Sequence, residues 1–472
     1  MPPFRVRFAP QVGILHNTES GPRTEPNSLD NSSPTHQRSH LGCRECRQRK
    51  VKCDETFPVC KRCQRRGSVC QPALRASQWR LEVPWLGDPG QSKTFITLKT
   101  TAKVDSRLMR YWLEGMSQIL ALDPSNNPFS FPILKYVSTS PSLVYVLQGV
   151  SAAHEQYFQQ SNMSTSLEER SKALASLRME LQTSGSLSHS FLALLMLGMS
   201  SSWITMGPDD YGREHLLAAR TVAEMVVEKN DSQITELDHL NMGIYVYWDM
   251  ACSFCLDPAD HPVNQVDSIN SYARQARNNF HAITAHSIDL YHLLGQLGRY
   301  CRLVVESGDR NLEYEAETET SLHSYTSIEC DPAARLLTEA FRKHGLLLLY
   351  RFCGKPGISS PGILEPMAVS TYTRQLALEV IDLILQTPPD SPCLNLHAIP
   401  LLSAGAEMTS FDIEERNGVR QRLNAVYSTN RLVPTLWVID LLEELWVLHD
   451  AGITHITWLE LMLIKNWRLR VG

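Results

Sequence analysis

Apolar residues recur at helical spacing from Asp105 to the C-terminus. The first segment places five of them on one face, because successive offsets of three or four residues follow the 3.6-residue turn of an α-helix. This face is Leu108, Trp112, Met116, Ile119 and Leu120. The pattern predicts an amphipathic helix that ends before Asp123-Pro124. The same periodicity predicts helices at about 141–160, 166–182, 188–205, 209–228, 236–256, 286–306, 333–353, 366–386, 412–427, 434–449 and 455–468.

Helix punctuation supports this pattern. Pro434 suits a first helical turn, where the missing N–H costs nothing, and the helix near 380 must stop before Pro388-Pro389. In the segment after Pro434, Leu445 and Trp446 turn inward. No run of alternating short strands interrupts the region. We therefore predict that residues 105–472 form one large all-α domain.

The first hundred residues differ in composition. Residues 1–40 are rich in Pro, Ser, Asn, Thr and Arg without apolar periodicity, which predicts a disordered N-terminal arm. Residues 72–104 contain several helix-breaking prolines and glycines, so we predict a linker. No sustained heptad pattern follows in this linker. The sequence therefore does not predict a local coiled-coil dimer, and the oligomeric state stays open.

Between the arm and the linker, residues 41–71 hold half of the twelve cysteines of the chain. Their spacing is C-x2-C-x6-C, written twice, and each half opens with a pair of thiols that can bind one metal ion. The six are Cys43, Cys46, Cys53, Cys60, Cys63 and Cys70. Two tetrahedral zinc ions need eight ligand positions, so six thiolates suffice only if two of them bridge both ions.

A disulfide framework and a set of buried free thiols both fit these cysteines less well than zinc does. Disulfides belong to oxidising compartments, and the start MPPFRVRFAPQVGILH has no apolar run that would serve as a signal peptide. Buried free thiols have no reason to lie at metal-ligand spacing among basic residues. His36 and His40 lie upstream, but the doubled pattern is complete without them.

The charge of the cysteine segment differs from that of the rest. Residues 38–70 hold ten Lys and Arg against three acids, a net +7, whereas the whole chain is −5. The remainder is therefore −12. A basic unit on an acidic chain indicates a polyanionic partner for that unit alone, and double-stranded DNA is the partner we predict.

This segment resembles the fungal-type binuclear zinc cluster regulators of transcription, the Zn(2)-C6 family. The resemblance rests on the six cysteines, the basic run that follows the second of them, Pro58 and Gly67. It implies two zinc ions bridged by Cys43 and Cys60, and a short first helix in the major groove. It also implies that Lys50, three residues before the third cysteine, reads a CGG-type triplet, with Arg49 as its neighbour. Arg62 departs from the asparagine that many members have there.

Together, these expectations assign roles to eight basic residues. Arg49 and Lys50 are predicted to face guanine edges, because bidentate donors to O6 and N7 are the commonest specific contact. The others are predicted to hold phosphates: Arg47, Lys52, Lys61, Arg62, Arg65 and Arg66.

The helical region resembles, more loosely, the fungal-specific regulatory domain that accompanies this cluster. The resemblance rests on the segment RYWLEGMSQILALDPSNNPFSFPILKYVSTSPSLVYVLQGVSAAHE near its start, and on HAIPLLSAGAEM, LWVIDLLEELW and WLELM near its end. The resemblance implies a nuclear regulator of RNA polymerase II transcription. Its mainly α fold would join a zinc-stapled two-helix module to a large helical body. That body would bind co-regulators or a small-molecule signal.

Several alternatives stay open. An enzyme with an accessory zinc unit is disfavoured because no phosphate-binding glycine loop or G-x-S-x-G elbow occurs. The second alternative is a nuclear interaction protein whose zinc cluster binds proteins instead of DNA.

Individual segments of the helical region have plain structural interpretations. The uncharged segment 181–208 suggests a buried helix rather than a membrane span, and Cys252, Cys255 and His344 suggest core positions. The acidic stretch 309–331 is predicted to be a surface loop, either an activation segment or a solvated insertion.

Overall fold

Helices are the regular structure of the described part of the chain. The computed structural model describes residues 42–54, 60–66, 68, 70, 100–159, 163–183, 186–204, 207–229, 234–258, 260, 268–354 and 366–471. Among them no strand occurs, and one isolated bridge joins His281 to Ala285. The predicted arm at 1–40 and all but the last few residues of the linker at 72–104 lie outside this description, as do Pro58 and Gly67.

The cysteine segment contains α1 (Arg44–Gln48) and α2 (Lys61–Arg66). The rest of the described chain contains sixteen α-helices joined by short 3₁₀ turns. They are α3 (Ser106–Glu114), α4 (Leu134–Val137), α5 (Pro141–Gln159), α6 (Ser164–Gln182), α7 (Leu187–Met199), α8 (Arg213–Val227), α9 (Glu236–Ala251), α10 (Ser268–Ala276), α11 (Ile288–Ser307), α12 (Leu312–Ser324), α13 (Pro332–Cys353), α14 (Pro366–Gln386), α15 (Ala398–Ala406), α16 (Ile413–Asn430), α17 (Pro434–Asp450) and α18 (Trp458–Ile464). The 3₁₀ turns are η2 (Met116–Ile119), η3 (Pro124–Asn126), η4 (Phe131–Ile133), η5 (Ser201–Trp203) and η8 (Pro392–Leu396). The predicted all-α region is thus confirmed for the described residues.

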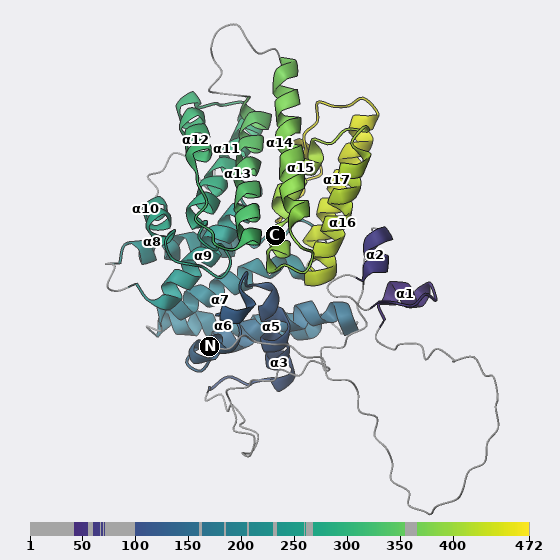
Figure 1. Cartoon of the computed structure of the whole chain (residues 1–472). Helices are drawn as coiled ribbons and strands as arrows, with labels where there is room; N and C mark the ends of the chain where they lie inside the picture. Colours follow the sequence, from purple (N-terminus) through teal and green to yellow (C-terminus); the bar gives the residue numbers. More distant parts are fainter. Residues whose placement is uncertain are drawn as a thin grey trace, which may run out of the picture.

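The helices form two groups that cross (Figure 1). In the view of Figure 1, α3, α5, α6 and α7 lie across the lower part, while α11 to α17 stand upright above them. Helix α9 joins the two groups, because it packs on α7 on one side and on α11 on the other. One continuous apolar core runs through both groups, from Ala102 to Val471. We call residues 100–471 the helical body.

Side-chain caps start several of these helices where the sequence changes from loop to periodic pattern. The carboxylate of Asp105 accepts the N–H groups of Arg107 and Leu108 at the start of α3. Asp331 caps α13 in the same way, with proline at the first helical position. Helices α9 and α18 begin with capping boxes, which satisfy donors in both directions. Each cap contributes about 1 kcal/mol, so local sequence fixes these boundaries.

Two predictions about individual segments were wrong. The single helix expected from residue 105 to 122 is divided at Gly115 into α3 and η2, because glycine is the least favourable non-proline residue in a helix interior. The acidic stretch 309–331, predicted to be a loop, contains helix α12. Its acids are not all solvated: Glu315 accepts the hydroxyl of Tyr300 at 2.6 Å. Glu319 likewise accepts from a buried tyrosine hydroxyl, so α12 packs on the core through its carboxylates.

Three short helices, α4, α10 and α15, had no prediction. Helix α15 reads AIPLLSAGA and is buried all round, so it has no polar face to give a periodic signal. The predicted core positions of Cys252, Cys255 and His344 are confirmed, since all three are buried. The ring of His344 bonds the Ser403 hydroxyl at 2.6 Å. Within the described residues, no helix is long and apolar enough to cross a membrane.

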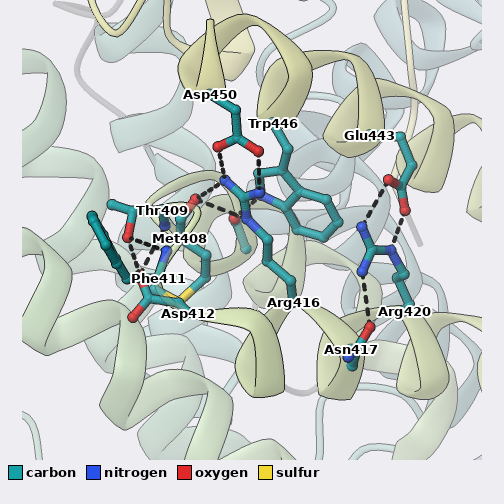
Figure 2. A network of polar contacts seen from close by, with 11 residues as sticks. Met408, Thr409, Phe411, Asp412, Arg416, Asn417, Arg420, Glu443, Trp446 and Asp450 are labelled. Carbon is teal, nitrogen blue, oxygen red and sulfur yellow. Dashed lines mark hydrogen bonds and ion pairs between the residues drawn. The ribbon is translucent and has the colours of Figure 1, made fainter. Parts of the chain in front are cut away.

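A polar clamp fixes α16 onto its neighbours (Figure 2). The guanidinium of Arg416 donates to both oxygens of Asp450 on α17, at 2.7 and 2.9 Å, and to the carbonyl oxygen of Met408. One turn later Arg420 pairs with Glu443, and its guanidinium lies 4.6 Å from the ring centre of Trp446. These contacts fix the N-terminal half of α16 onto α17, whereas the cysteine segment lies near the other end of α16 (Figure 1).

Acidification is expected to destabilise the helical body. Burial lowers the pKa of His154 and His281 to about 4 and that of His344 to about 3, from an ordinary 6.5. Between these values the unfolded state binds the protons and the folded state does not. Each histidine therefore removes about 1.4 kcal/mol of unfolding free energy per pH unit as pH falls below 6.5. Denaturant unfolding at pH 7.5 and 5.5 measures the effect. His344→Gln should reduce the slope, whereas replacing the exposed His455 should not.

Candidate zinc cluster and nucleic-acid interface

The six cysteine sulfurs of the N-terminal segment converge on one point. They form two groups of four, and within each group the sulfurs lie within 4.8 Å of one another. Cys43 and Cys60 belong to both groups; Cys46 and Cys53 complete the first, and Cys63 and Cys70 complete the second, all six being buried. Sulfur–sulfur distances are 3.8 Å for Cys43–Cys60, 3.6 Å for Cys43–Cys63 and 3.7 Å for Cys46–Cys60. A tetrahedron of zinc–sulfur bonds of about 2.3 Å has an edge of about 3.8 Å, so the donors fit zinc.

The two halves of the segment have the same local geometry. The N–H of Cys46 donates to the sulfur of Cys43, and the N–H of Cys63 donates to the sulfur of Cys60, both at 3.4 Å. Each C-x2-C pair therefore stands at the start of a short helix, with both sulfurs on one side. The repeat that the spacing indicates is present in the backbone as well as in the sequence.

The sulfurs form an unfavourable arrangement unless a cation joins them. Burial, and hydrogen bonds with the neighbouring sulfurs, raise the pKa of the Cys63 thiol to about 12, and they raise the pKa of Cys46 further. Zinc reverses this balance, because its charge stabilises the thiolates that bind it. No disulfide joins any of the twelve cysteines, all of which are described. The donor set thus fits metal binding rather than covalent cross-linking.

Helix α1 ends in a Schellman motif whose left-handed residue is Lys50. The N–H of Lys50 donates to the carbonyl of Arg47, and the N–H of Val51 donates to the carbonyl of Cys46. Lys50 has a φ of 56°, a conformation that glycine adopts without strain and lysine does not. In the second half of the repeat the equivalent position in the sequence is Gly67. The first half therefore has a long cationic side chain where the backbone favours glycine.

All eight basic residues predicted to contact DNA are exposed. Four lie on or just after α1, and four lie on α2, where Arg65 and Arg66 form the last turn. The guanidinium of Arg49 pairs with Glu45 one turn earlier, at 2.5 Å. A surface pair of this kind is worth only about 0.3–0.5 kcal/mol, so it does not prevent Arg49 from contacting another group.

The sequence did not indicate that the helical body holds the cluster. The backbone of Cys70 is hydrogen-bonded to the side chains of Ser428 and Arg431, near the C-terminal end of α16. No motif marks these two residues, because they are ordinary in a helical segment. Only the backbone of Arg431 is unusual, because its φ is 57° although it is not glycine.

Comparisons with known proteins agree with this geometry. Residues 107–472 match the model of the fungal specific transcription factor domain, and residues 41–80 match that of the fungal Zn(2)-Cys(6) binuclear cluster domain. No solved structure matches the chain significantly.

Three curated proteins are similar to parts of the chain. The "Zn(2)-C6 fungal-type transcription factor afumD" of Aspergillus fumigatus is 54% identical over 35 residues, which is 7% of this chain and 9% of that protein. The "Transcriptional regulatory protein moc3" of Schizosaccharomyces pombe is 26% identical over 181 residues, 36% of this chain and 35% of that protein. The "Transcription activator AMTR1" of Alternaria alternata is 53% identical over 36 residues, 8% and 5% of the two chains. The matches thus span about a third or less of these relatives.

Proposed function

Because the chain belongs to the family defined by the fungal specific transcription factor domain, we propose that it is a sequence-specific DNA-binding regulator of RNA polymerase II transcription, acting in the nucleus. The observation that carries this proposal is the pairing of six converging sulfurs with eight exposed basic side chains on one small unit. The chemistry is binding, and we assign the helical body a regulatory rather than a catalytic role. Its partners beyond DNA would be transcriptional co-regulators.

The proposed cluster holds two zinc ions through Cys43, Cys46, Cys53, Cys60, Cys63 and Cys70. Cys43 and Cys60 would be ligands of both ions, which is supported by their membership of both sulfur groups. With every ligand position taken by cysteine, no position stays open for water or substrate, so the metal is structural. It replaces the apolar core that so short a segment cannot form.

Recognition is proposed to begin at the end of α1. Lys50 donates to the guanine edges of a CGG-type triplet, with Arg49 beside it, and the Schellman turn directs the lysine past the helix end. Basic side chains on α2, such as Arg65 and Arg66, lie on the other half of the repeat and hold phosphates. Base contacts give specificity, whereas phosphate contacts give affinity and position.

The Lys50→Ala variant tests this division. If Lys50 reads guanine O6 and N7, its loss should cost about 1–3 kcal/mol on the preferred duplex and much less on random DNA. The matched controls Arg65→Ala and Arg66→Ala should weaken both duplexes together. They should also lower the slope of log affinity against log salt by about one unit. Binding titrations with both duplexes over a salt series measure these effects. Equal weakening of both duplexes by Lys50→Ala, with a lower salt slope, would make Lys50 a phosphate contact.

A further inference from the structure

Two side chains of the helical body form hydrogen bonds with the main chain of Cys70, the last cysteine of the cluster. The N–H of Cys70 donates to the Ser428 hydroxyl at 3.1 Å, and the carbonyl oxygen of Cys70 accepts from the Arg431 guanidinium at 2.6 Å. Both side chains are buried. The partners are 358 and 361 residues apart in sequence. Both backbone groups of one cluster residue are therefore satisfied by the distant body.

Apolar residues of the helical body are buried together with the cysteines of the cluster. Ala425 and Val426 of α16 and Leu394 of η8 are buried in one apolar group with the six cysteines. Figure 1 shows α2 beside the end of α16. Apolar burial strengthens the polar contacts, because hydrogen bonds shielded from water are electrostatically stronger. We call Leu394, Ala425, Val426, Ser428 and Arg431 the docking site.

The backbone of the docking site is strained where it binds Cys70. Arg431 ends α16 in the left-handed region, with φ 57°. Glycine is the usual residue there, and an L side chain costs about 1–2 kcal/mol. Strain of this kind persists where the surrounding structure compensates for it. Here the compensation is the buried bond from the guanidinium to the carbonyl of Cys70.

Helices from the N-terminal part of the helical body contact the turn at the end of α16. The carbonyl of Asn430, the residue before Arg431, lies 2.6 Å from Nε2 of His154 on α5. Nδ1 of the same ring lies 2.7 Å from the hydroxyl of Tyr111 on α3. Because burial keeps His154 neutral by lowering its pKa to about 4, Nε2–H donates and Nδ1 accepts. The N-terminal helices thus hold the turn that presents Arg431.

The docked face and the basic face are different parts of the cluster. Docking uses the main chain of Cys70 and the buried cysteines, whereas all eight basic side chains assigned to DNA stay exposed. The contact therefore leaves those side chains accessible. A device that blocked DNA binding would cover them instead.

We propose that the docking site is a receptor for the chain's own zinc cluster, which fixes the orientation of the DNA-reading helix relative to the helical body and persists when DNA is bound. The inference rests on the proposed function for its role, but the contact itself exists without DNA. Changes in the body, such as co-regulator binding, would then reach the cluster through α16 rather than through the linker alone.

The test uses the full zinc-loaded chain and the double variant Ser428→Ala/Arg431→Gly. Glycine relieves the strain at 431, so the body should keep its thermal stability while it loses the contact. Hydrogen exchange of peptides that contain the Cys70 amide is measured without DNA. We expect exchange about 10- to 100-fold faster than in the wild type. Unchanged exchange would overturn the proposal. Ser428→Ala alone repeats the measurement if the double variant is unstable.

A matched control comes from the same helix. Arg420→Ala removes the ion pair with Glu443 shown in Figure 2, away from the cluster. Its effect on hydrogen exchange at Cys70 should be negligible. Acceleration as large as in the double variant would show that any damage to α16 suffices, and the docking site would lose its special role.

The orientation is tested on DNA. Cys330 is the exposed one among the twelve cysteines, so a spin label on it can be measured against a label at the duplex end. A narrow distance distribution is expected for the wild type and a broad one for the double variant, with zinc content unchanged and affinity within about threefold. A broad wild-type distribution would overturn persistence on DNA. A tenfold gain in the variant's affinity would make the contact inhibitory, contrary to the proposal. Failure of the Lys50 experiment would leave the hydrogen-exchange result intact.

Discussion

Replacing Cys60 with serine is expected to disrupt both metal positions and to reduce specific DNA binding to the level of random DNA. The sulfur of Cys60 belongs to both groups of four, so in the proposed two-ion cluster its loss would leave each zinc ion one ligand short. Structural zinc contributes about 10–16 kcal/mol of apparent binding free energy in small modules, which is most of their folding free energy. Specific binding is typically about 10³–10⁷ tighter than non-specific binding. A loss of at least 10³-fold is therefore expected.

The comparison variant is Cys53→Ser. Cys53 belongs to only one sulfur group, so in the proposed cluster its loss would affect one ion directly and the other through the fold. Cys330→Ser is the neutral control, because this thiol is exposed and lies outside the cluster. Zinc per chain, measured by elemental analysis, should be two in the wild type and in Cys330→Ser, at least one in Cys53→Ser, and lowest in Cys60→Ser. One zinc ion in the wild type would refute the two-ion cluster.

Replacing Asp249 with alanine should strongly destabilise the helical body. Asp249 on α9 accepts a hydrogen bond of 2.7 Å from the Arg299 guanidinium on α11, and both side chains are 4% exposed. Burial alone would disfavour the charged guanidinium, yet the carboxylate holds the pKa of Arg299 above its ordinary value. Removing the carboxylate leaves a buried charge without its ion-pair partner, which costs about 3–5 kcal/mol. Denaturant unfolding followed by helical circular dichroism measures the loss.

Two variants separate this effect from general sensitivity. Glu444→Ala removes a partly exposed pair with Lys465 and should cost no more than about 1 kcal/mol. The double replacement Asp249→Leu/Arg299→Met removes both charges and should recover part of the stability. If Asp249→Ala cost no more than Glu444→Ala, the α9–α11 ion pair would have no special role in the fold.

The sequence predicted the metal site and many helices because these features depend on interactions between residues close together in the chain. A C-x2-C pair has its ligand geometry within one turn of backbone, so the doubled spacing predicted a metal site before any fold was known. Apolar periodicity likewise predicted α5, α6, α13, α14 and α17 within a few residues of their observed bounds. Caps and prolines are equally local, and Pro434 begins α17 as predicted.

Composition misled where burial depended on distant partners. The stretch 309–331 was predicted to be a loop because its acids are dense. Helix α12 forms there because Glu315 and Glu319 bond the hydroxyls of Tyr300 and Tyr350, which come from α11 and α13. No local pattern specifies these partners.

The cluster's own residues and their spacing were determined by the sequence alone, and so was its basic charge. The left-handed conformation of Lys50 became visible only in the structure, although its hydrogen bonds are local. Only the tertiary packing decided that Arg431 binds Cys70. The contact between Arg431 and Cys70 joins residues 361 positions apart. It exists because the packing of α3, α5 and α17 holds the end of α16 beside the cluster. Ligand spacing is a property of neighbouring residues, whereas the meeting of two distant surfaces depends on how the whole core packs.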